Sequence, residues 1–584
     1  MNGSAKQKLR QQIAFLYGED QASALVFRIV EMVEKHRDIA GVTPSEILSK
    51  KFSEKDSILI AYGDIIQDSS KLALQALDDF LKNRFEEQIN TVHILPFFPY
   101  SSDDGFSIIN YRSIDPKLGT WEDIREIAKT KKIMVDAVIN HISSESVWFE
   151  KFLAGDPTYQ DYFIQVDETW DLSKVVRPRT SPLLTEFQTK SGPKQIWTTF
   201  SADQVDLNYA NPEVLLAVLD VLLFYLQQGA NIIRLDAIAY LWKESGTTCI
   251  HLPQTHRVVK ILRLVLEAAS PQAVIITETN VPHVENLSYF GEVDPETGQT
   301  DEAHMVYQFP LAPLVLYSLI SGHANRLMDW VDALTPAGLF FNFIASHDGI
   351  GVLPAKGILT AEELQEVIDQ VHRHGGLLSH RSNPDGTKTV YELNTTLYDA
   401  LNDPKTPDPA VDIDRFLASQ VILLSLAGVP GIYYHSLFGS RNALDEVQET
   451  GRARSINRKK FSLNEIDKML GDPNNIHARI FREMRHLLGV RSRQLEFDPY
   501  GRQAVFPADQ RIFGLMRYSP DGSSRILVLV NVSSEVFDLS VGAAVFNHPE
   551  KIQDLISGEM FKAVDGNINL HFTPYQYLWL KAQD

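Results

Sequence analysis

The amino-acid sequence predicts an α/β fold in which eight strand–helix repeats close on themselves, followed by a small antiparallel β domain. Eight short apolar runs recur along the chain, with segments of helical periodicity between them. The runs are apolar on both faces, as is typical of strands in a buried parallel sheet. Residues 495–584 alternate with period two and contain PDG and DG turns. Together these observations predict a TIM (β/α)8 barrel with an appended sheet. The eight runs are residues 56–64, 90–97, 132–141, 231–238, 273–280, 304–309, 339–348 and 430–435.

The first 55 residues precede the first strand and predict a helical extension. Apolar residues recur with helical spacing between Ile13 and Val33. The segment TPSEILSKKF, residues 43–52, has Pro near its start and an acidic residue soon after, which predicts a second short helix. The sequence leaves open whether this extension packs on the barrel or forms a homodimer contact.

Two intervals between strands are too long for a single helix. Ile133 and Ile232 are 99 residues apart and Phe340 and Gly431 are 91 apart, whereas the other spacings are about 30 to 40 residues. We therefore expect a barrel domain over residues 56–494 with insertions at 142–205 and 349–428, and a C-terminal β domain at 495–584. Both insertions follow carboxyl ends of strands, the face where barrel enzymes hold their active sites.

The composition restricts the partners. The chain has 584 residues, and 55 Lys and Arg against 75 Asp and Glu give a formal net charge of −20. Binding to nucleic acid or to an anionic membrane needs a positive field, so we expect neither. Cys249 is the only cysteine, which excludes an intrachain disulfide and a cysteine-rich metal cluster. A signal-peptide pattern and a spanning apolar stretch are both missing, so we expect a cytoplasmic protein.

Polar and charged residues stand where the apolar runs end, and a buried strand does not tolerate such residues without partners. In a barrel all these ends converge on one mouth. Several carboxylates, two histidines and an arginine at one mouth therefore indicate a site, although any one of the carboxylates alone could cap a helix or bind a metal. The residues are Asp103, Asn140, His141, Arg234, Asp236, Glu278, His347 and Asp348.

Carboxylates in this arrangement suit the cleavage of a glycosidic bond. One carboxylate attacks the anomeric carbon, while another, kept protonated, gives its proton to the leaving oxygen. Arg234 and Asp236 are two residues apart and so share one face of the strand. A charge-assisted hydrogen bond from Arg234 would hold Asp236 ionised and oriented.

Four segments at the strand ends resemble the signature segments of the α-amylase family of glycoside hydrolases. They are DAVINH, RLDA, the Glu of ITETN, and SHD, in this order. The resemblance spans about residues 56–490 and implies a retaining α-glucosidic mechanism. It implies that Asp236 is the nucleophile, Glu278 the general acid/base and Asp348 the transition-state stabiliser. The glucose subsite would then be lined by His141, Arg234 and His347.

Within that family the sequence is most similar to the sucrose phosphorylase subfamily. HILPFFPYSSDDGFSIINY resembles its second-strand segment, which implies that Asp103 clamps glucose and that Phe106 is an aromatic platform. The RPR motif at 177–179 resembles its phosphate site, which implies that Arg179 and Tyr391 bind phosphate. A guanidinium group offsets the repulsion between a phosphate dianion and nearby carboxylates. Further substrate contacts implied by the resemblance are Phe200, Gln204, Tyr240 and Arg454.

Three features depart from the sucrose phosphorylase pattern. Glu392 stands where a Gln is usual after the Tyr, Asn280 stands where a His is usual two residues after the acid/base, and the helical extension is additional. All three resemble the glucosylglycerate phosphorylases of the same subfamily, which implies glycerate as the acceptor and places Glu392 in the substrate site. The carboxylate of glycerate calls for a cation, and Arg381 and His380 are the candidates.

Other activities stay open. Sucrose, glucosylglycerol or sucrose 6-phosphate could be the substrate of the same machinery, and a hydrolase or transglucosidase would be indifferent to phosphate. A non-catalytic barrel is disfavoured because all three carboxylates are present. We expect no cofactor, since inorganic phosphate is a substrate. We also expect no metal, because residues 142–205 hold no clustered run of oxygen ligands.

Overall fold

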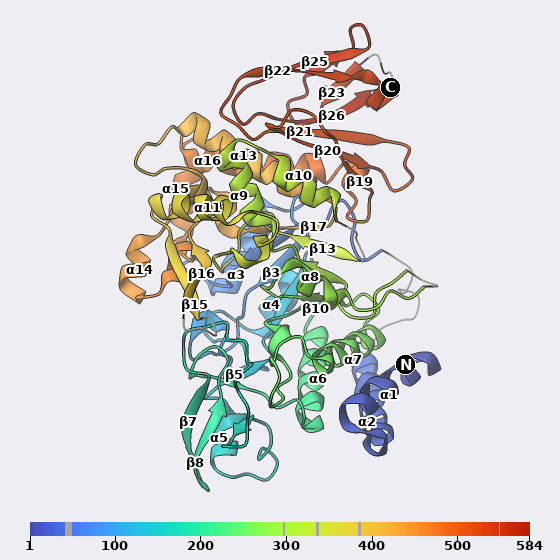
Figure 1. Ribbon diagram of the computed structural model, residues 1–584, viewed down its shortest axis with the longest axis vertical. Coiled ribbons are helices and arrows are strands. Elements are labelled where there is room, and N and C mark those ends of the chain that lie inside the picture. The colour runs from blue at the N-terminus through green and yellow to red at the C-terminus, as the bar shows by residue number, and fades with distance from the viewer. Residues whose placement is uncertain are drawn as a thin grey trace.

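The computed structural model describes residues 1–40, 50–295, 298–334, 338–382, 387–547, 549 and 551–583. At its centre eight parallel strands form a closed barrel in the spatial order β1–β17–β13–β12–β11–β10–β4–β3 (Figure 1). Each strand falls within, or one residue outside, one of the eight apolar runs, so the predicted barrel is confirmed. The strands are β1 (Ile58–Ala61), β3 (Thr91–Ile94), β4 (Lys132–Ala137), β10 (Ala230–Leu235), β11 (Val274–Thr277), β12 (Met305–Tyr307), β13 (Leu339–Asn342) and β17 (Val429–Tyr433).

The barrel strands are shorter than the apolar runs that predicted them. We expected the third strand to reach His141 and the seventh to reach Asp348, but β4 ends at Ala137 and β13 at Asn342. Both extensions were wrong because the chain leaves the barrel at its rim and stays buried as it enters the loops. His141 therefore lies on β5 (His141–Ser143), outside the barrel, while His347 and Asp348 lie in the loop after β13.

Helices surround the barrel, and local capping marks where several of them begin. Helix α6, for example, has Pro212 as its first residue and Asn211 as its N-cap, whose side chain accepts a hydrogen bond from the Glu213 amide. None of the helices in the described parts of the chain is long and apolar enough to cross a bilayer. The surrounding helices are α3 (Ala73–Arg84), α4 (Trp121–Ala128), α6 (Pro212–Gln227), α7 (Pro253–Ala269), α9 (Leu311–Ser321), α13 (Pro409–Ser425) and α16 (Ile476–Arg491).

The N-terminal extension packs on the barrel's outer helices. Helices α1 (Gly3–Tyr17) and α2 (Glu19–Ala40) form a hairpin that lies against α6 and α7 (Figure 1). The side chains of Ile13 and Val33 are fully buried there, and the Tyr17 hydroxyl donates to the Tyr209 carbonyl at 2.9 Å. Most of the second predicted helix, residues 43–49, lies outside the described residues.

Two groups of elements interrupt the barrel repeat after β4 and after β13. The first holds α5 (Val147–Leu153), a sheet of β6 (Gln165–Val166), β8 (Gly192–Trp197) and β7 (Leu184–Thr189), and the pair formed by β5 and β9 (Gln204–Asp206). The second holds α11 (Ala361–Arg373), α12 (Leu397–Leu401) and a sheet of β14 (Ile350–Gly351), β16 (Lys388–Asn394) and β15 (Leu377–Ser382). Helices α14 (Leu444–Thr450) and α15 (Leu463–Gly471) follow β17.

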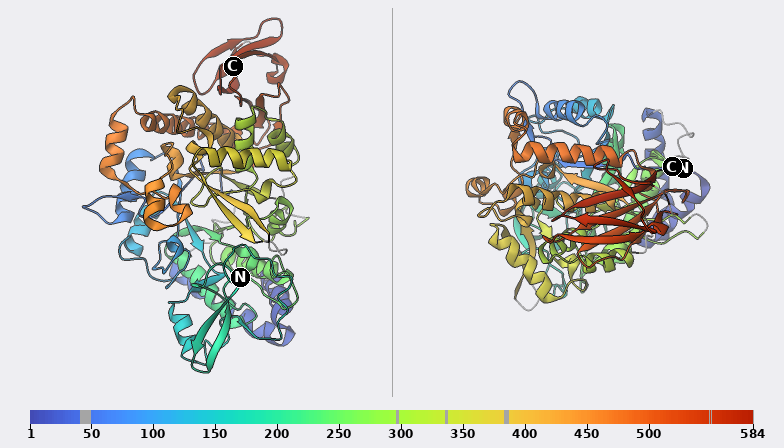
Figure 2. Two further views of the ribbon diagram at one scale, coloured as in Figure 1. Left: turned by 60° about the vertical axis from the view of Figure 1, so that its left-hand side comes forward. Right: turned by 90° about the horizontal axis from the view of Figure 1, so that it is seen from above.

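The C-terminal β domain lies at the opposite end of the molecule from the first group of inserted strands (Figures 1 and 2). Its main sheet holds β19 (Gln503–Val505), β20 (Ile512–Tyr518), β21 (Arg525–Asn531), β26 (Tyr577–Gln583), β23 (Lys551–Asp554) and β24 (Met560–Lys562), and β22 (Phe537–Gly542) pairs with β25 (Asn567–Phe572). Two fully buried side chains join it to α13. Arg517 donates to the Ser425 carbonyl at 2.8 Å, and the Trp579 indole donates to the Ser425 hydroxyl at 2.9 Å.

Candidate active site

One pocket at the carboxyl ends of the barrel strands collects most of the site residues predicted from the sequence. Asn140, Arg234, His380 and Arg381 are not in its wall. The loops after β3, β4, β10, β11 and β13 contribute to it, together with β16 and the segment 453–457 after α14. It is also lined by Pro178, Ala237, Ala239, Thr279, Asn280 and Val281, which the sequence did not single out apart from Asn280. The predicted residues in its wall are Asp103, Phe106, His141, Arg179, Phe200, Gln204, Asp236, Tyr240, Glu278, His347, Asp348, Tyr391, Glu392 and Arg454.

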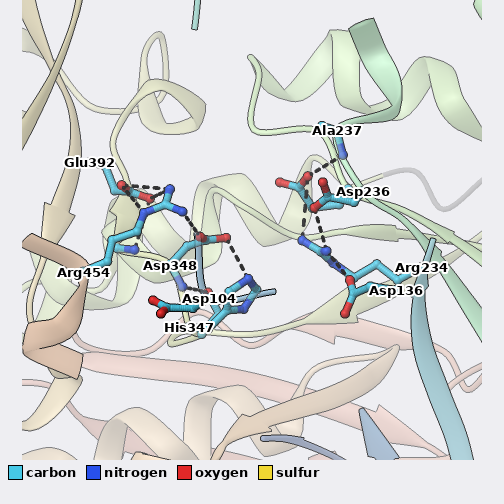
Figure 3. A network of polar contacts seen from close by, with 12 residues as sticks. Asp104, Asp136, Arg234, Asp236, Ala237, His347, Asp348, Glu392 and Arg454 are labelled. Atoms are coloured by element: carbon cyan, nitrogen blue, oxygen red, sulfur yellow. Dashed lines mark hydrogen bonds and ion pairs between the residues drawn. The ribbon is translucent and has the colours of Figure 1, made fainter. Parts of the chain in front are cut away.

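Arg234 lies beneath the pocket instead of lining it. Its side chain is only 1% exposed, and it contacts three carboxylates (Figure 3). It donates to Asp236 at 2.8 Å and to Asp136, and its second terminal nitrogen is 3.8 Å from Glu278. The Tyr307 hydroxyl accepts from Nε at 2.9 Å. Arg234 therefore holds the carboxylates of the pocket from outside the pocket wall, and its contribution to the glucose subsite stays a prediction.

Glu278 and Asp236 differ in how strongly the protein holds their charged forms. Burial raises the pKa of Glu278 to about 7, and the neighbouring Asp236 and Asp348 add to this, against the opposing effect of Arg234. Burial also raises the pKa of Asp236, which Arg234 opposes at hydrogen-bonding distance. Since Arg234 is 1 Å closer to Asp236 than to Glu278, a proton shared by the pair at neutral pH belongs on Glu278.

Asp348 is held ionised by cations. Burial alone would raise its pKa, but the guanidinium groups of Arg454 and Arg458 lower it well below the ordinary range. The closest of these contacts joins Arg454 Nη1 and Asp348 Oδ1 at 2.6 Å (Figure 3). Burial lowers the pKa of His347 to about 3, so its ring is neutral at pH 7 and adds no charge to the site.

Glu392 is engaged within the protein. Arg454 donates to its two oxygens at 2.9 and 3.2 Å, and the Gly349 amide donates to Oε1 at 3.1 Å. The side chain is 1% exposed. Its charge is therefore neutralised by Arg454, which removes the conflict between Glu392 and an anionic acceptor in the same pocket.

A β-bulge explains how Tyr391 and Glu392 can both line the pocket. Neighbouring residues of a regular strand point to opposite faces. Here Ser379 pairs with Glu392 and His380 with Val390, so Tyr391 is an extra residue of β16 that has no partner on β15. Bulges of this kind re-aim side chains beside active sites.

The loop after β3 holds Asp103 and Phe106 in a strained conformation. Asp103 and Asp104 have φ values of 53° and 49°, in the left-handed region. At Gly105, with φ of 109°, a Cβ atom would lie 2.6 Å from the Pro96 carbonyl oxygen, so only glycine fits. Asp104 is paired with Arg458. The loop therefore aims Asp103 into the pocket at a conformational cost that these contacts offset.

Aromatic rings form one wall of the pocket. The Phe106 ring is stacked on His347, with centroids 4.9 Å apart and an angle of 2° between planes. Phe200 meets Tyr240 edge-on at 5.6 Å. The Phe106 carbonyl accepts from His141 Nε2 at 2.9 Å and from Gln204 Nε2 at 3.0 Å, which holds these two polar side chains at the wall.

Arg179 lies in the pocket wall with its charge uncompensated. Its guanidinium carbon is 6.0 Å from the Phe200 ring centre and 5.9 Å from the Tyr391 ring centre. Over the described residues, no carboxylate or hydrogen-bond acceptor contacts the Arg179 side chain. A guanidinium held between two aromatic rings and left without an anion is suited to bind one.

The comparisons with known proteins agree with this geometry. The α-amylase catalytic-domain family matches residues 79–348. A glucosylglycerate phosphorylase from Spirochaeta thermophila is 43% identical over 98% of this chain and 98% of its own length. Another, from Allomeiothermus silvanus, is 45% identical, again over 98% of both chains. The chain belongs to the glucosylglycerate phosphorylase family.

The fold of this chain also matches the solved structure of another phosphorylase. The crystal structure of sucrose 6F-phosphate phosphorylase from Thermoanaerobacter thermosaccharolyticum superposes with a TM-score of 0.72. It covers 89% of this chain and 99% of its own, at 26% sequence identity. The fold is thus common to both, and the two glucosylglycerate phosphorylases are far more similar in sequence.

Three buried charged groups escaped the sequence analysis. Asp136 on β4 is fully buried and accepts from His93 at 2.8 Å as well as from Arg234. Lys243 and Asp206 form a buried ion pair at 2.5 Å, and Lys243 also donates to Asn140 at 2.8 Å. Asp136 begins the quoted DAVINH segment, so its place within an apolar strand was the available signal.

The two candidate cations for an acceptor carboxylate, His380 and Arg381, differ in their surroundings. Neither residue is in the pocket wall, but His380 is exposed whereas Arg381 is partly buried. Arg381 on β15 lies close enough to Tyr240 for its charge to oppose the rise in the Tyr240 pKa that burial causes. Among the described residues, Arg381 Nε is buried without a hydrogen-bond partner, and so is Oδ1 of Asn280 in the pocket wall.

Proposed function

We propose that this chain catalyses the reversible phosphorolysis of glucosylglycerate to α-D-glucose 1-phosphate and glycerate. The observation that carries the proposal is an unpaired Arg179 in the same pocket as three carboxylates of unequal protonation. A hydrolase needs the carboxylates alone, because water carries no charge into the site. A phosphorylase also needs a cation that meets the phosphate.

In the first step the glucosyl group moves from glycerate to the enzyme. A carboxylate oxygen of Asp236 bonds to the anomeric carbon as the bond from that carbon to the glycerate oxygen breaks. Glu278 gives its proton to the departing oxygen, which its raised pKa permits near neutral pH. Ionised Asp348 stabilises the positive charge that develops on the sugar ring.

In the second step phosphate takes the glucosyl group. A phosphate oxygen bonds to the anomeric carbon, the bond to Asp236 breaks, and the phosphate proton passes to Glu278. Two inversions give net retention, so the product is the α anomer. Arg179 and the Tyr391 hydroxyl are the groups that hold the phosphate, and no cofactor or metal takes part in either step. Over the described residues, no group of three or more His, Cys, Asp or Glu side chains is arranged for a metal ion.

Recognition of glycerate falls to the side of the pocket formed by β16 and Asn280, with β15 next to β16. The unpartnered Nε of Arg381 meets the glycerate carboxylate, and the Asn280 amide oxygen accepts from a glycerate hydroxyl. Neutralisation of Glu392 by Arg454 lets an anion approach without repulsion.

The deciding experiment is a comparison of substrates in phosphate buffer. The purified protein is incubated with glucosylglycerate, sucrose, sucrose 6-phosphate and glucosylglycerol, and release of glucose 1-phosphate is measured. We expect turnover of glucosylglycerate to exceed that of the others by at least 100-fold in kcat/KM, about 2.7 kcal/mol. Preference for sucrose would keep the mechanism and refute the acceptor. Release of glucose at a rate independent of phosphate would refute the phosphorylase itself.

A further inference from the structure

A second concave site lies on the outer surface, between α3 and α16. This basic groove has a volume of about 510 Å³, and it shares no lining residue with the catalytic pocket. Four arginines and a histidine face it, and no carboxylate is found in its described lining. Its charged residues are Arg84, Arg482, Arg485, His486 and Arg493.

The charge of this groove is opposite in sign to the net charge of the molecule. The chain carries a net charge of −20, yet residues 479–493 hold five arginines and one histidine against a single acidic residue, Glu483. Only one of these arginines, Arg491, is buried for structural reasons, donating to the carbonyls of Leu424 and Glu54. A local field of opposite sign on an acidic protein attracts anions to that place alone.

Two of the groove's arginines are unpaired. Arg84 is bound to Asp467 at 2.8 Å and Arg482 to Glu483 at 3.4 Å. The side chains of Arg485 and Arg493 are exposed and, throughout the described part of the chain, have no ion pair or hydrogen bond. Arg485 lies 6.0 Å from the Phe85 ring centre, which fixes its direction.

The backbone of α16 leaves room for a ligand between these arginines. Residues 482, 485, 486 and 489 follow one helical face, and position 489 is glycine. A Cβ atom there would meet only Arg493 Nη1 at 3.6 Å and Gln88 Cγ at 3.9 Å, so the floor is open. His486 donates from Nε2 to the Ile556 carbonyl at 2.8 Å, which holds its ring at the edge.

We propose that this groove binds a small metabolite carrying more than one phosphate group. Guanidinium forks match phosphate oxygens in geometry and charge. The Arg493 guanidinium lies over Gly489, one helical turn after Arg485, so two guanidinium forks face adjoining positions that two linked phosphates can fill. Leu470 and Pro473 supply an apolar wall for the body of the ligand. The site is independent of the proposed catalytic reaction.

Binding of pyrophosphate and of ATP to the full chain, measured by isothermal titration calorimetry, tests this site. We expect R485E/R493E to weaken binding at least 30-fold. The matched control, K6E/K35E, makes the same change of charge at exposed lysines of α1 and α2 and is expected to change binding less than twofold. ATP binding without pyrophosphate binding identifies a nucleotide; comparable binding of both identifies the polyphosphate moiety as sufficient.

A third variant guards against misfolding of the double mutant. G489E places a carboxylate on the groove floor without removing an arginine, and we expect it to weaken binding by a similar factor. Pyrophosphate held in the catalytic pocket would bind all variants equally, and that result would overturn the proposal. Failure of the unmutated protein to bind either probe at 1 mM would overturn it as well.

Discussion

Arg454 and Glu392 form a bidentate ion pair at the mouth of the barrel, with nitrogen–oxygen distances of 2.9 and 3.2 Å. Glu392 is 1% exposed and Arg454 19% exposed, and Arg454 also holds Asp348 at 2.6 Å. Glu392 is therefore the buried counter-charge that lets a partly buried arginine lie beside the catalytic carboxylate.

We expect Glu392→Ala to lower the free energy of unfolding by about 3–5 kcal/mol, because the change leaves Arg454 short of a buried partner. Urea unfolding measures the effect. Glu213→Ala is the matched control: it breaks the Arg28–Glu213 pair, whose side chains are 46–48% exposed, and is expected to cost less than about 1 kcal/mol. Equal losses for the two variants would contradict the role given to burial.

The pKa of Glu278, about 7, predicts the pH dependence of catalysis. Glu278 must be protonated to serve as the acid, so kcat/KM for glucosylglycerate is expected to fall as pH rises above about 7. Glu278→Gln should reduce kcat/KM by about 10²–10⁴-fold. With α-glucosyl fluoride, whose leaving group needs no proton, the initial burst of fluoride should survive in E278Q. Loss of that burst would show that the substitution damages more than proton transfer.

The same raised pKa predicts a change in stability with pH. A raised pKa in the folded state contributes stability below the unfolded pKa of about 4.3, and this contribution declines until the folded pKa is reached. Because of this carboxyl, the free energy of unfolding should therefore fall progressively from pH 4.3 to about 7. Glu278→Gln removes the effect, so E278Q should gain stability relative to the original protein over that interval, reaching on the order of 3 kcal/mol. Thermal unfolding at pH 5 and pH 8 measures it; a constant difference would refute the pKa.

Arg179 should matter for phosphate and for nothing else in the reaction. We expect Arg179→Ala to lower kcat/KM for phosphate by about 10–100-fold, the value of losing a charged hydrogen bond. Slow hydrolysis of the glucosyl-enzyme by water should be unchanged. Arg177, which donates to the Ser181 carbonyl and does not line the pocket, supplies the control variant R177A. An R179A enzyme with an unchanged KM for phosphate would place the phosphate site elsewhere.

The role of Arg381 in binding glycerate can be tested in the synthetic direction. With glucose 1-phosphate as donor, Arg381→Ala is expected to raise the KM for glycerate about 10-fold or more and to leave the KM for glucose 1-phosphate unchanged. Any activity with glycerol, which lacks the carboxylate, should be the same in both enzymes. His380→Ala is the neighbouring control, since His380 is exposed. A uniform loss with both acceptors would indicate a structural role for Arg381.

The sequence predicts the barrel well because its strands are buried on both faces and stand out as short apolar runs. The catalytic residues could be identified from the same apolar runs, because a charged residue at the end of a buried strand needs a partner or a function. The positions of Arg234 and Glu392 could not be predicted in this way. Arg234 sits below the pocket and Glu392 faces an arginine 62 residues away, and contacts of this kind arise only when distant loops meet.

The bulge at Tyr391 has a consequence for how acceptor preference can change in evolution. The bulge couples Tyr391 and Glu392. A substitution, insertion or deletion in β16 therefore disturbs the phosphate contact of Tyr391 and the charge balance of Arg454 at the same time. Strand β15, which carries Arg381, does not combine two such contacts. Enzymes selected in the laboratory for new acceptors should therefore keep Tyr391 and Glu392 and accumulate their changes around position 381.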